Sequence, residues 1–306
     1  MRHASHISVL LAEAVDALAL SPDSVVIDAT LGAGGHASLI LEKLGAGGKL
    51  LGIDADAAAI AAFRARLSEG THDAAVELAV GNFRNIVAIA AANGIHHADA
   101  ILADFGWRME QFVGTKAEGG GKGFSFTTDE PLLMTYGDPE TYPFVARDII
   151  NDWREEDIAN VLKGYGEERY ARRIARAIVG ARERALIETA AALADVVSAA
   201  VPGAYRHSRI HPATKTFQAL RIAVNDELDA IRAFMEDARS LLTEHGRLAI
   251  ITFHSIEDRI VKHTIRAFEH NGQVRRITKK PIVPTDEEIA RNPRARSAKL
   301  RILETL

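Results

Sequence analysis

The segment at residues 25–41, VVIDATLGAGGHASLIL, constrains the fold of this chain more than any other part of it. Three apolar residues lead into Asp28, a glycine-rich turn follows, and an apolar pattern with helical spacing begins after the turn. The same alternation continues downstream, and it predicts strands at 24–28, 49–54, 76–80 and 98–106 and helices at 36–44, 56–67 and 85–94. Strands that alternate with helices require right-handed crossovers, so we expect a doubly wound α/β sheet covered on both faces.

The alternation stops after the fourth of these strands. Residues 113–123 are rich in glycine and predict a loop, whereas residues 148–201 are almost wholly helical in pattern. Residues 216–242 predict one long helix with a single apolar face, which Gly246 should end. The remaining elements are expected at 247–253 (strand), 255–268 (helix) and 298–304 (a closing edge strand).

These patterns predict a discontinuous domain organisation. The α/β core should comprise residues 1–112 and 209–306, and a helical insertion should occupy residues 113–208.

The glycine turn is typical of a cofactor site, and two cofactors fit it. Gly32, Gly34 and Ala37 satisfy the relaxed dinucleotide fingerprint, and Asp54 lies where an acid that binds a ribose diol belongs. Asp28 is the discriminating residue, because a carboxylate near the turn would repel a pyrophosphate but would attract the sulfonium and ammonium of S-adenosylmethionine. The spacing therefore favours S-adenosylmethionine, while a nicotinamide cofactor and a purely structural turn remain alternatives.

Candidate catalytic residues follow two of the predicted strands. Asp104 ends the fourth strand, and His254 and Ser255 follow the strand at 247–253. Ligands of open α/β sheets bind beyond the carboxyl ends of the strands, so these side chains should face the ligand. The alternatives are a helix cap for either residue, or a structural histidine whose hydrogen bonds are satisfied within the protein. No spacing of histidines and acids resembles a zinc site, and we expect no metal.

Composition limits the possible chemistry and partners. The chain has no cysteine, which removes disulfides, thiolate metal sites and cysteine nucleophiles. The formal net charge is −4, yet residues 275–301 carry nine Lys or Arg against three acids, which is compatible with a polyanionic partner. The apolar run at 8–20 contains Glu13 and Asp16 and is too short to span a bilayer, so we expect a cytoplasmic protein without a membrane partner.

Several long blocks of the chain occur in the order typical of one family. They are HISVLLAEAV, DATLGAGGH, GNF, KGFSF, YGEERYARRIARAIV, HPATKTFQALRIAVNDEL, GRLAIITFHSIEDRIVK and NPRARSAKLR. With these blocks the chain resembles, over almost its whole length, the bacterial 16S rRNA (cytosine-N4)-methyltransferase family of the RsmH or MraW type.

The resemblance implies a fold, an activity and a set of site residues. The fold would be a class I (Rossmann-like) S-adenosylmethionine-dependent methyltransferase with an inserted helical domain that recognises the substrate. The reaction would be methylation of the exocyclic N4 amine of a cytosine in the decoding centre of 16S rRNA, within the small ribosomal subunit or its precursor. The cofactor contacts would fall, besides Asp28 and Gly32, on Gly34, Gly35, His36, Asp54, Phe83, Asp104 and Gln111.

Two segments depart from the family pattern. Where the family usually has two serines after the fourth strand, this chain has Arg108 and Met109. In PLLMTYGD, Leu133 and Thr135 replace an acid and an arginine. Both segments would border the substrate base, so the exact target is less well defined than the cofactor.

The residue types also bear on mechanism. Methylation of C5 in cytosine generally needs a covalent thiolate, which this chain lacks, whereas an exocyclic amine needs only positioning and an acceptor for its protons. We assign the acceptor role to Asp104 and proton removal to His254, with Ser255 as a neighbouring candidate.

Basic residues in the second half of the chain together predict an RNA-binding surface, with a solvated helix face as the alternative for the arginines alone. A stripe of arginines at helical spacing precedes further candidates in the HPATKTFQALRIAVNDEL block, and RNA phosphates would be their ligands. The predicted contacts are Arg169, Arg172, Arg173, Arg176, Arg209, His211, Lys215 and Asn225. The target base would have to leave its stack to reach the pocket.

Two rival functions remain open at this point, as does a homodimer. One is a ribosome-assembly or RNA-binding factor that keeps the cofactor fold but has weakened catalysis, suggested by the two departing segments. The other is a nicotinamide oxidoreductase, which the position of Asp28 disfavours.

Overall fold

The structure is a computed structural model of the chain, and it describes residues 8–105, 121–126, 129–208 and 210–306. By their internal packing the residues divide into two compact units. Unit 1 comprises Met1–Gly106 and Leu228–Leu306, and unit 2 comprises Trp107–Glu227. Unit 2 has one hydrophobic core, and unit 1 has two, one on each face of its sheet.

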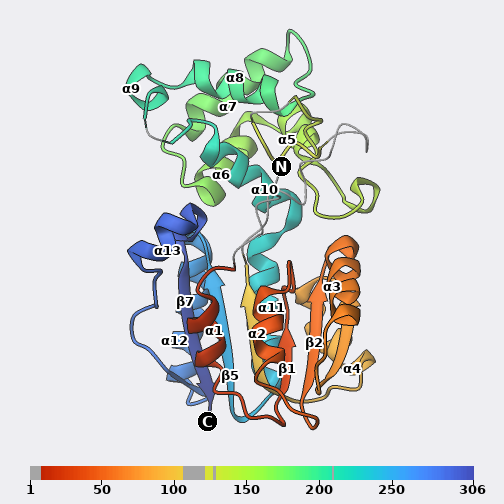
Figure 1. Cartoon of the computed structure of the whole chain (residues 1–306). Coiled ribbons are helices and arrows are strands. Elements are labelled where there is room, and N and C mark those ends of the chain that lie inside the picture. Colours follow the sequence, from red (N-terminus) through yellow and green to blue (C-terminus); the bar gives the residue numbers. More distant parts are fainter. Residues whose placement is uncertain (1–7, 106–120, 127–128, 209) are drawn as a thin grey trace. The chain divides into compact units, whose positions relative to one another are not determined.

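A seven-stranded sheet forms the centre of unit 1, with the order β3-β2-β1-β4-β5-β7-β6 (Figure 1). Strands β3, β2, β1, β4 and β5 are mutually parallel, whereas β7 runs antiparallel to both of its neighbours. The doubly wound sheet predicted from the alternation is therefore confirmed. The strands are β1 (Val25–Asp28), β2 (Lys49–Asp54), β3 (Ala75–Val80), β4 (Ala98–Asp104), β5 (Leu242–Thr252), β6 (Val274–Arg276) and β7 (Lys299–Thr305).

Helices cover both faces of this sheet because successive strand residues point to opposite sides. Val26 packs into a core with α1 (Leu11–Ala17), α2 (Gly35–Leu41) and α3 (Ala57–Glu69). Its neighbour Ile27 packs into a second core on the other face. That face is covered by α4 (Ile86–Ala92), α11 (Glu227–Leu241) and α12 (Ser255–His270). The short elements η1 (Phe83–Asn85), α13 (Asp286–Arg291) and η4 (Pro293–Ser297) complete unit 1.

The topology brings three acidic residues together at the carboxyl ends of neighbouring strands. Strand β1 lies between β2 and β4, so the strand order reverses at β1. Asp28, Asp54 and Asp104 are the last residues of these three parallel strands. In a sheet of this type the ligand binds at such a reversal, beyond the carboxyl ends of the strands.

Unit 2 is helical, as the sequence predicted for its central part. Its core consists mainly of alanine, leucine, isoleucine and valine side chains from the facing helices, with α6 packed on both α7 and α10. The helices are α5 (Ala146–Asp152), α6 (Glu155–Gly166), α7 (Ala171–Arg182), α8 (Ala190–Ala200), α9 (Gly203–Arg206) and α10 (Thr214–Asn225), with the 3-10 turn η3 (Pro139–Thr141).

The prediction of a single long helix at 216–242 is wrong. Two helices, α10 and α11, occupy this stretch, and Asp226 between them has the left-handed backbone angles φ 49° and ψ 42°. Aspartate tolerates the left-handed conformation better than most residues, and this conformation at Asp226 ends α10. The apolar face that appeared continuous serves two cores, because Phe217 and Leu220 pack in unit 2 whereas Ile231 and Met235 pack in unit 1.

Two further expectations about the carboxyl-terminal half differ from the structure. The helix ends at Leu241, where β5 begins, so Gly246 lies within β5 and does not end the helix. The strand predicted at the edge, β7, lies inside the sheet because β6 pairs with its outer side.

The packing-based division also differs from the expected insertion at 113–208. Helix α10 groups with unit 2 because it packs on α6, so unit 2 extends to Glu227. Among the described residues, no helix is both long and apolar enough to cross a membrane.

Candidate functional site at the carboxyl end of the sheet

The glycine turn after β1 needs glycine at specific positions. Gly32 and Gly34 have φ angles of 55° and 70°, in the left-handed region that glycine favours. A β-carbon on Gly34 would also overlap the ring of Phe63 from α3. The N–H of Gly34 donates to the carbonyl of Leu31 at 2.7 Å and closes the turn just before α2. Because the glycines have no side chains, the backbone of the turn can lie close to the ends of the strands.

Asp54 holds this turn in place. Its Oδ2 accepts a hydrogen bond from the N–H of Gly32 at 2.7 Å, and its Oδ1 accepts one from the N–H of Asp56 at 2.9 Å. The sequence assigned Asp54 to a ribose. The structure adds that its carboxylate connects the end of β2 to the turn after β1.

Asp28 is a buried acid with unused hydrogen-bonding capacity. Its side chain is 1% exposed, and Oδ1 accepts the N–H of Thr30 at 3.1 Å. Oδ2 is buried and has no hydrogen-bond partner within the part of the chain that the structure describes. Burial raises the pKa of Asp28 to about 7, the Thr30 hydrogen bond lowers it, and the negative charge of Asp54 raises it further. A cation placed here would favour the ionised carboxylate, as proposed from the sequence.

Thr30 links the ends of β1 and β4. Its Oγ1 accepts the N–H of Asp104 at 2.6 Å, while its own N–H binds Asp28. Nothing in the sequence pattern marked Thr30, because it lies 74 residues from Asp104 and only the sheet brings the two residues together. This bridge aligns the backbone of Asp104 with that of Asp28.

Phe83 belongs to an aromatic cluster after β3. Its ring centroid lies 5.2 Å from that of Phe105 and 5.5 Å from that of Phe234. The contact with Phe234 is edge-to-face, a favourable geometry for aromatic pairs. Phe83 is partly exposed, and the contacts with Phe105 and Phe234 hold its ring in place.

Gly35 and His36 begin α2 and contact the segment before α1. Nε2 of His36 lies 3.1 Å from the carbonyl oxygen of Val9, and the imidazole is buried. The predicted cofactor residue Gln111 and the departures Arg108 and Met109 lie outside the described residues.

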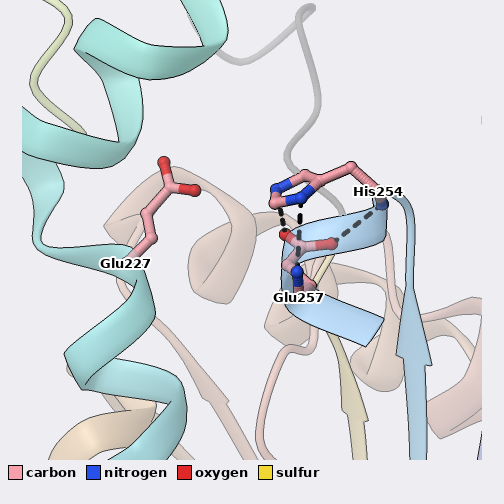
Figure 2. Close-up of side chains that lie close together, drawn as sticks. All are labelled: Glu227, His254 and Glu257. Atoms are coloured by element: carbon pink, nitrogen blue, oxygen red, sulfur yellow. Dashed lines mark hydrogen bonds and ion pairs between the residues drawn. The ribbon is translucent and has the colours of Figure 1, made fainter. Parts of the chain in front are cut away.

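His254 caps the helix α12 (Figure 2). Its Nδ1 accepts the N–H of Glu257 at 3.3 Å, and its Nε2 lies 3.0 Å from Oε1 of Glu257. Oε2 of Glu257 accepts the N–H groups of Phe253 and His254, which completes a reciprocal capping box. His254 therefore acts as a helix cap, which was the alternative that the sequence left open. Ser255 is the first residue of α12 and is exposed.

Glu257 is a residue that the sequence reasoning missed. It is 2% exposed, and its spacing of three residues after His254 was the available signal. Figure 2 also draws Glu227, which belongs to unit 2. There Arg221 binds the carboxylate of Glu227 in a bidentate ion pair at 2.7 and 2.8 Å, and the Tyr136 hydroxyl donates to it at 2.7 Å.

The four arginines predicted as a stripe on one helix face are exposed on unit 2, but Arg169 precedes α7 and only the other three lie on that helix. Their side chains have different contacts. The guanidinium of Arg169 lies over the rings of Tyr170 and Tyr205, at 4.7 and 4.8 Å from their centroids. Arg172 and Arg173 are exposed and have no ring or carboxylate partner within the described ranges. Arg176 lies 3.5 Å from a carboxylate oxygen of Glu155.

A buried acid orders the two tyrosines beneath Arg169. Glu168 is 2% exposed, and it accepts the N–H of Tyr170 at 2.8 Å and the hydroxyl of Tyr205 at 2.7 Å. Burial and this bond raise the pKa of Tyr205, so its hydroxyl stays protonated. Glu168 and Tyr205 were not predicted as site residues.

The other predicted RNA contacts have different surroundings. The exposed ring of His211 stacks on Phe126 with centroids 4.3 Å apart, and Nζ of Lys215 donates to the carbonyl of Glu167 at 2.9 Å. Asn225 is 9% exposed, and its amide bonds the backbone of Tyr136, Met134 and Arg221. Asn225 is therefore occupied inside unit 2, where it holds the 134–136 segment. Arg209 lies outside the described residues.

The departure in PLLMTYGD is also integrated into unit 2. Thr135 is fully buried, and its hydroxyl donates to the carbonyl of Gly137 at 3.1 Å. Leu133 is partly buried, and its carbonyl accepts the N–H of Ala146 at the start of α5. Both replacements fit the local packing.

Sequence comparisons with known proteins cover nearly the whole chain. The model of the MraW methylase family matches residues 3–306. The chain is 42% identical to the ribosomal RNA small subunit methyltransferase H of Brevibacillus brevis, over 98% of each chain. It is 41% identical to the protein of that name from Paenibacillus sp. (98% of this chain, 99% of the relative) and 40% identical to that from Clostridioides difficile (98% and 99%).

Proposed function

Since this chain belongs to the MraW methylase family, we propose that it transfers a methyl group from S-adenosylmethionine to the exocyclic N4 amine of a cytosine in 16S rRNA. The relatives at 40–42% identity are named as methyltransferases of small-subunit ribosomal RNA. The observation that carries the proposal is the buried carboxylate of Asp28 beside the glycine turn, with one oxygen that has no hydrogen-bond partner among the described residues.

The charge at this edge of the sheet supports a cationic cofactor. Asp28, Asp54 and Asp104 end three adjacent strands, and a pyrophosphate would meet their combined negative charge. S-adenosylmethionine brings a sulfonium and an ammonium and no phosphate. In this proposal Asp28 binds the positive part of the cofactor, the turn at Gly32–Gly35 lies against it, and Phe83 stacks on its adenine.

The chemistry proposed for methyl transfer uses positioning rather than a covalent intermediate. The lone pair of the cytosine N4 amine is delocalised into the ring, so the amine must be held in line with the methyl group and its protons must be accepted. We assign the acceptor role to Asp104, whose backbone Thr30 aligns with β1. His254 is the second candidate, although the cap already uses its Nδ1 as an acceptor.

Unit 2 is the proposed RNA-recognition domain. Arg169 supports this role because its exposed guanidinium lies over the rings of Tyr170 and Tyr205, and a guanidinium held in this way is suited to bind a phosphate. Arg172, Arg173 and Arg176 extend the same exposed basic stripe. The substrate within this proposal is 16S rRNA in the small subunit or its precursor, methylated in the cytoplasm.

Nucleoside mass spectrometry tests the proposal directly. Purified small subunits from cells that lack the protein are incubated with it and with S-adenosylmethionine carrying a labelled methyl group. We expect label in N4-methylated cytidine of 16S rRNA, and none when the protein is left out of the incubation. Label on another base or atom would contradict the N4 assignment, and cofactor binding without any transfer would favour an RNA-binding factor.

A further inference from the structure

The residues just before α1 lie against the glycine turn. A β-carbon on Gly35 would overlap Oγ of Ser8, so the serine side chain directly contacts the first residue of α2. One residue on, the carbonyl of Val9 lies 3.1 Å from Nε2 of the buried His36. The segment Ser8–Leu10 therefore lies over the part of the turn to which we assign the cofactor.

This segment has a backbone conformation that needs support. Leu10 is fully buried and has the left-handed angles φ 51° and ψ 38°, which a leucine adopts only when its surroundings impose them. It is also the N-cap of α1, and its own side chain cannot accept a hydrogen bond. A contact from elsewhere in the chain is needed to hold it.

Glu288 supplies that contact from the opposite end of the sequence. Its Oε1 accepts the N–H of Leu10 at 2.7 Å across a separation of 278 residues. A carboxylate that accepts from a backbone amide forms a charge-assisted bond, about twice as strong as a neutral one.

Glu288 is itself well placed by its helix. Its N–H donates to Oγ1 of Thr285, the N-cap of α13, at 3.2 Å. Its carbonyl accepts the N–H of Asn292 at 2.7 Å. The next turn, η4, buries Ala295 in the same core as Val9 and Leu10. The position of Glu288 is therefore fixed by the hydrogen bonds and packing of α13 and η4.

We propose that Glu288 is a positioning residue for cofactor binding: it keeps Ser8–Leu10 against the Gly34–His36 turn and thereby preserves the shape of the cofactor site. The inference rests on the proposed cofactor site at this turn. Loss of the carboxylate leaves the buried Leu10 N–H without an acceptor and releases the left-handed backbone, so the segment no longer holds His36 and Gly35 in place.

Two substitutions at Glu288 and one matched control test this role. The dissociation constant of S-adenosylmethionine should rise about tenfold in Glu288→Ala and only about two- to threefold in Glu288→Gln, because glutamine keeps an acceptor oxygen. Glu287→Ala removes the same charge from an exposed neighbour and should leave the constant unchanged. At saturating cofactor, kcat and the KM for RNA should stay within about twofold of wild type.

A purely structural role would give a different result. In that case Glu288→Ala would lower the melting temperature while the affinity for S-adenosylmethionine stayed at the wild-type value, and the proposal would be overturned. If circular dichroism shows that Glu288→Ala does not fold, Glu288→Gln decides, since equal affinity to wild type then contradicts the proposal. If instead Gly34→Ala binds the cofactor as tightly as wild type, the cofactor site itself is misassigned.

Discussion

The carboxylate of Asp54 accepts a hydrogen bond from the backbone N–H of Gly32 at 2.7 Å, and this bond ties the end of β2 to the glycine turn after β1. The same carboxylate accepts the N–H of Asp56, so both of its oxygens bind backbone donors. An acid that the sequence assigned only to a ligand therefore also shapes the site that receives the ligand.

Asp54→Asn should weaken cofactor binding. An asparagine has one acceptor oxygen, so one of the two backbone donors would face an NH2 group. We expect the affinity for S-adenosylmethionine to fall about tenfold or more by titration calorimetry. Asp56→Asn is the matched control, because Asp56 caps α3 through the N–H of Ala58 and asparagine is an equally good cap. Equal losses in both variants would argue against the specific role of Asp54.

Asp28→Asn should stabilise the cofactor-free protein but weaken its binding of the cofactor. The pKa of Asp28 is about 7 in the folded protein against an ordinary 3.8, so the folded state binds more protons between these values. The stabilisation from protonated Asp28 is complete below 3.8 and is lost as pH rises through about 7. At pH 8 the neutral asparagine should therefore raise the stability of the cofactor-free protein, by on the order of 4 kcal/mol, and by less at pH 5.

The affinity for the cofactor should change in the opposite direction. In the wild type it should rise with pH through about 7, as the carboxylate ionises and attracts the cation. Asp28→Asn should bind more weakly and without this pH dependence, as measured by calorimetry from pH 5.5 to 8.5. The exposed Asp23→Asn serves as the control. A pH-independent wild-type affinity would remove Asp28 from the cofactor site.

Gly34→Ala should be more disruptive than glycine replacement at a comparable backbone angle elsewhere. Gly34 and Gly94 have φ angles of 70° and 69°, but a β-carbon on Gly34 would overlap Phe63 whereas one on Gly94 meets no atom within 4 Å. Gly94→Ala should lower stability by about 1 kcal/mol through backbone strain alone. Gly34→Ala should lower it further and weaken cofactor binding, measured by thermal melts with and without S-adenosylmethionine.

His254→Asn tests whether the imidazole removes a proton. Asparagine is a good N-cap and can replace the acceptor that Nδ1 of His254 offers to Glu257. If His254 acts only as a cap, the variant keeps most of its activity; if it is the base, kcat falls by about 100-fold or more. Asp104→Asn should lower kcat in either case while cofactor affinity changes less. Normal turnover in both variants would leave the proton acceptor elsewhere.

Arg169→Ala should weaken RNA binding more than Arg172→Ala. Both substitutions remove one exposed positive charge, but only Arg169 is ordered over Tyr170 and Tyr205. Filter binding over a range of salt concentrations should show a smaller salt slope for both, by about 1 for each lost phosphate contact. Identical losses would mean that the stripe acts by charge alone. Affinity for S-adenosylmethionine should be unaffected in both.

Much of the fold could be predicted because short-range periodicity encodes it. The alternation of apolar runs and helical patterns predicted four of the parallel strands and the helices between them close to their observed ranges. The expected helix at 216–242 failed because its periodicity is continuous through Asp226 although its two halves pack in different cores. Periodicity reports which side of a helix is apolar, and it carries no information about which core that side enters.

Some residues of the candidate site could also be predicted from the sequence, and others could not. Residue type and spacing were sufficient to select Asp28, the glycine turn and Asp54. Glu257 was within reach as well, because a capping box has a fixed spacing of three residues. Thr30 and Glu288 were not, since their partners lie 74 and 278 residues away and no local pattern marks such pairs.

The sequence by itself determined the class of fold, the family and the type of ligand, because glycine positions, acid spacing and long motif blocks are properties of neighbouring residues. Only the tertiary structure decided how these residues behave. Burial of Asp28 beside Asp54 raises its pKa to about 7, and pairing with Glu257 makes His254 a helix cap. Desolvation, long-range hydrogen bonds and core packing depend on which distant residues meet, and the folded chain alone specifies that.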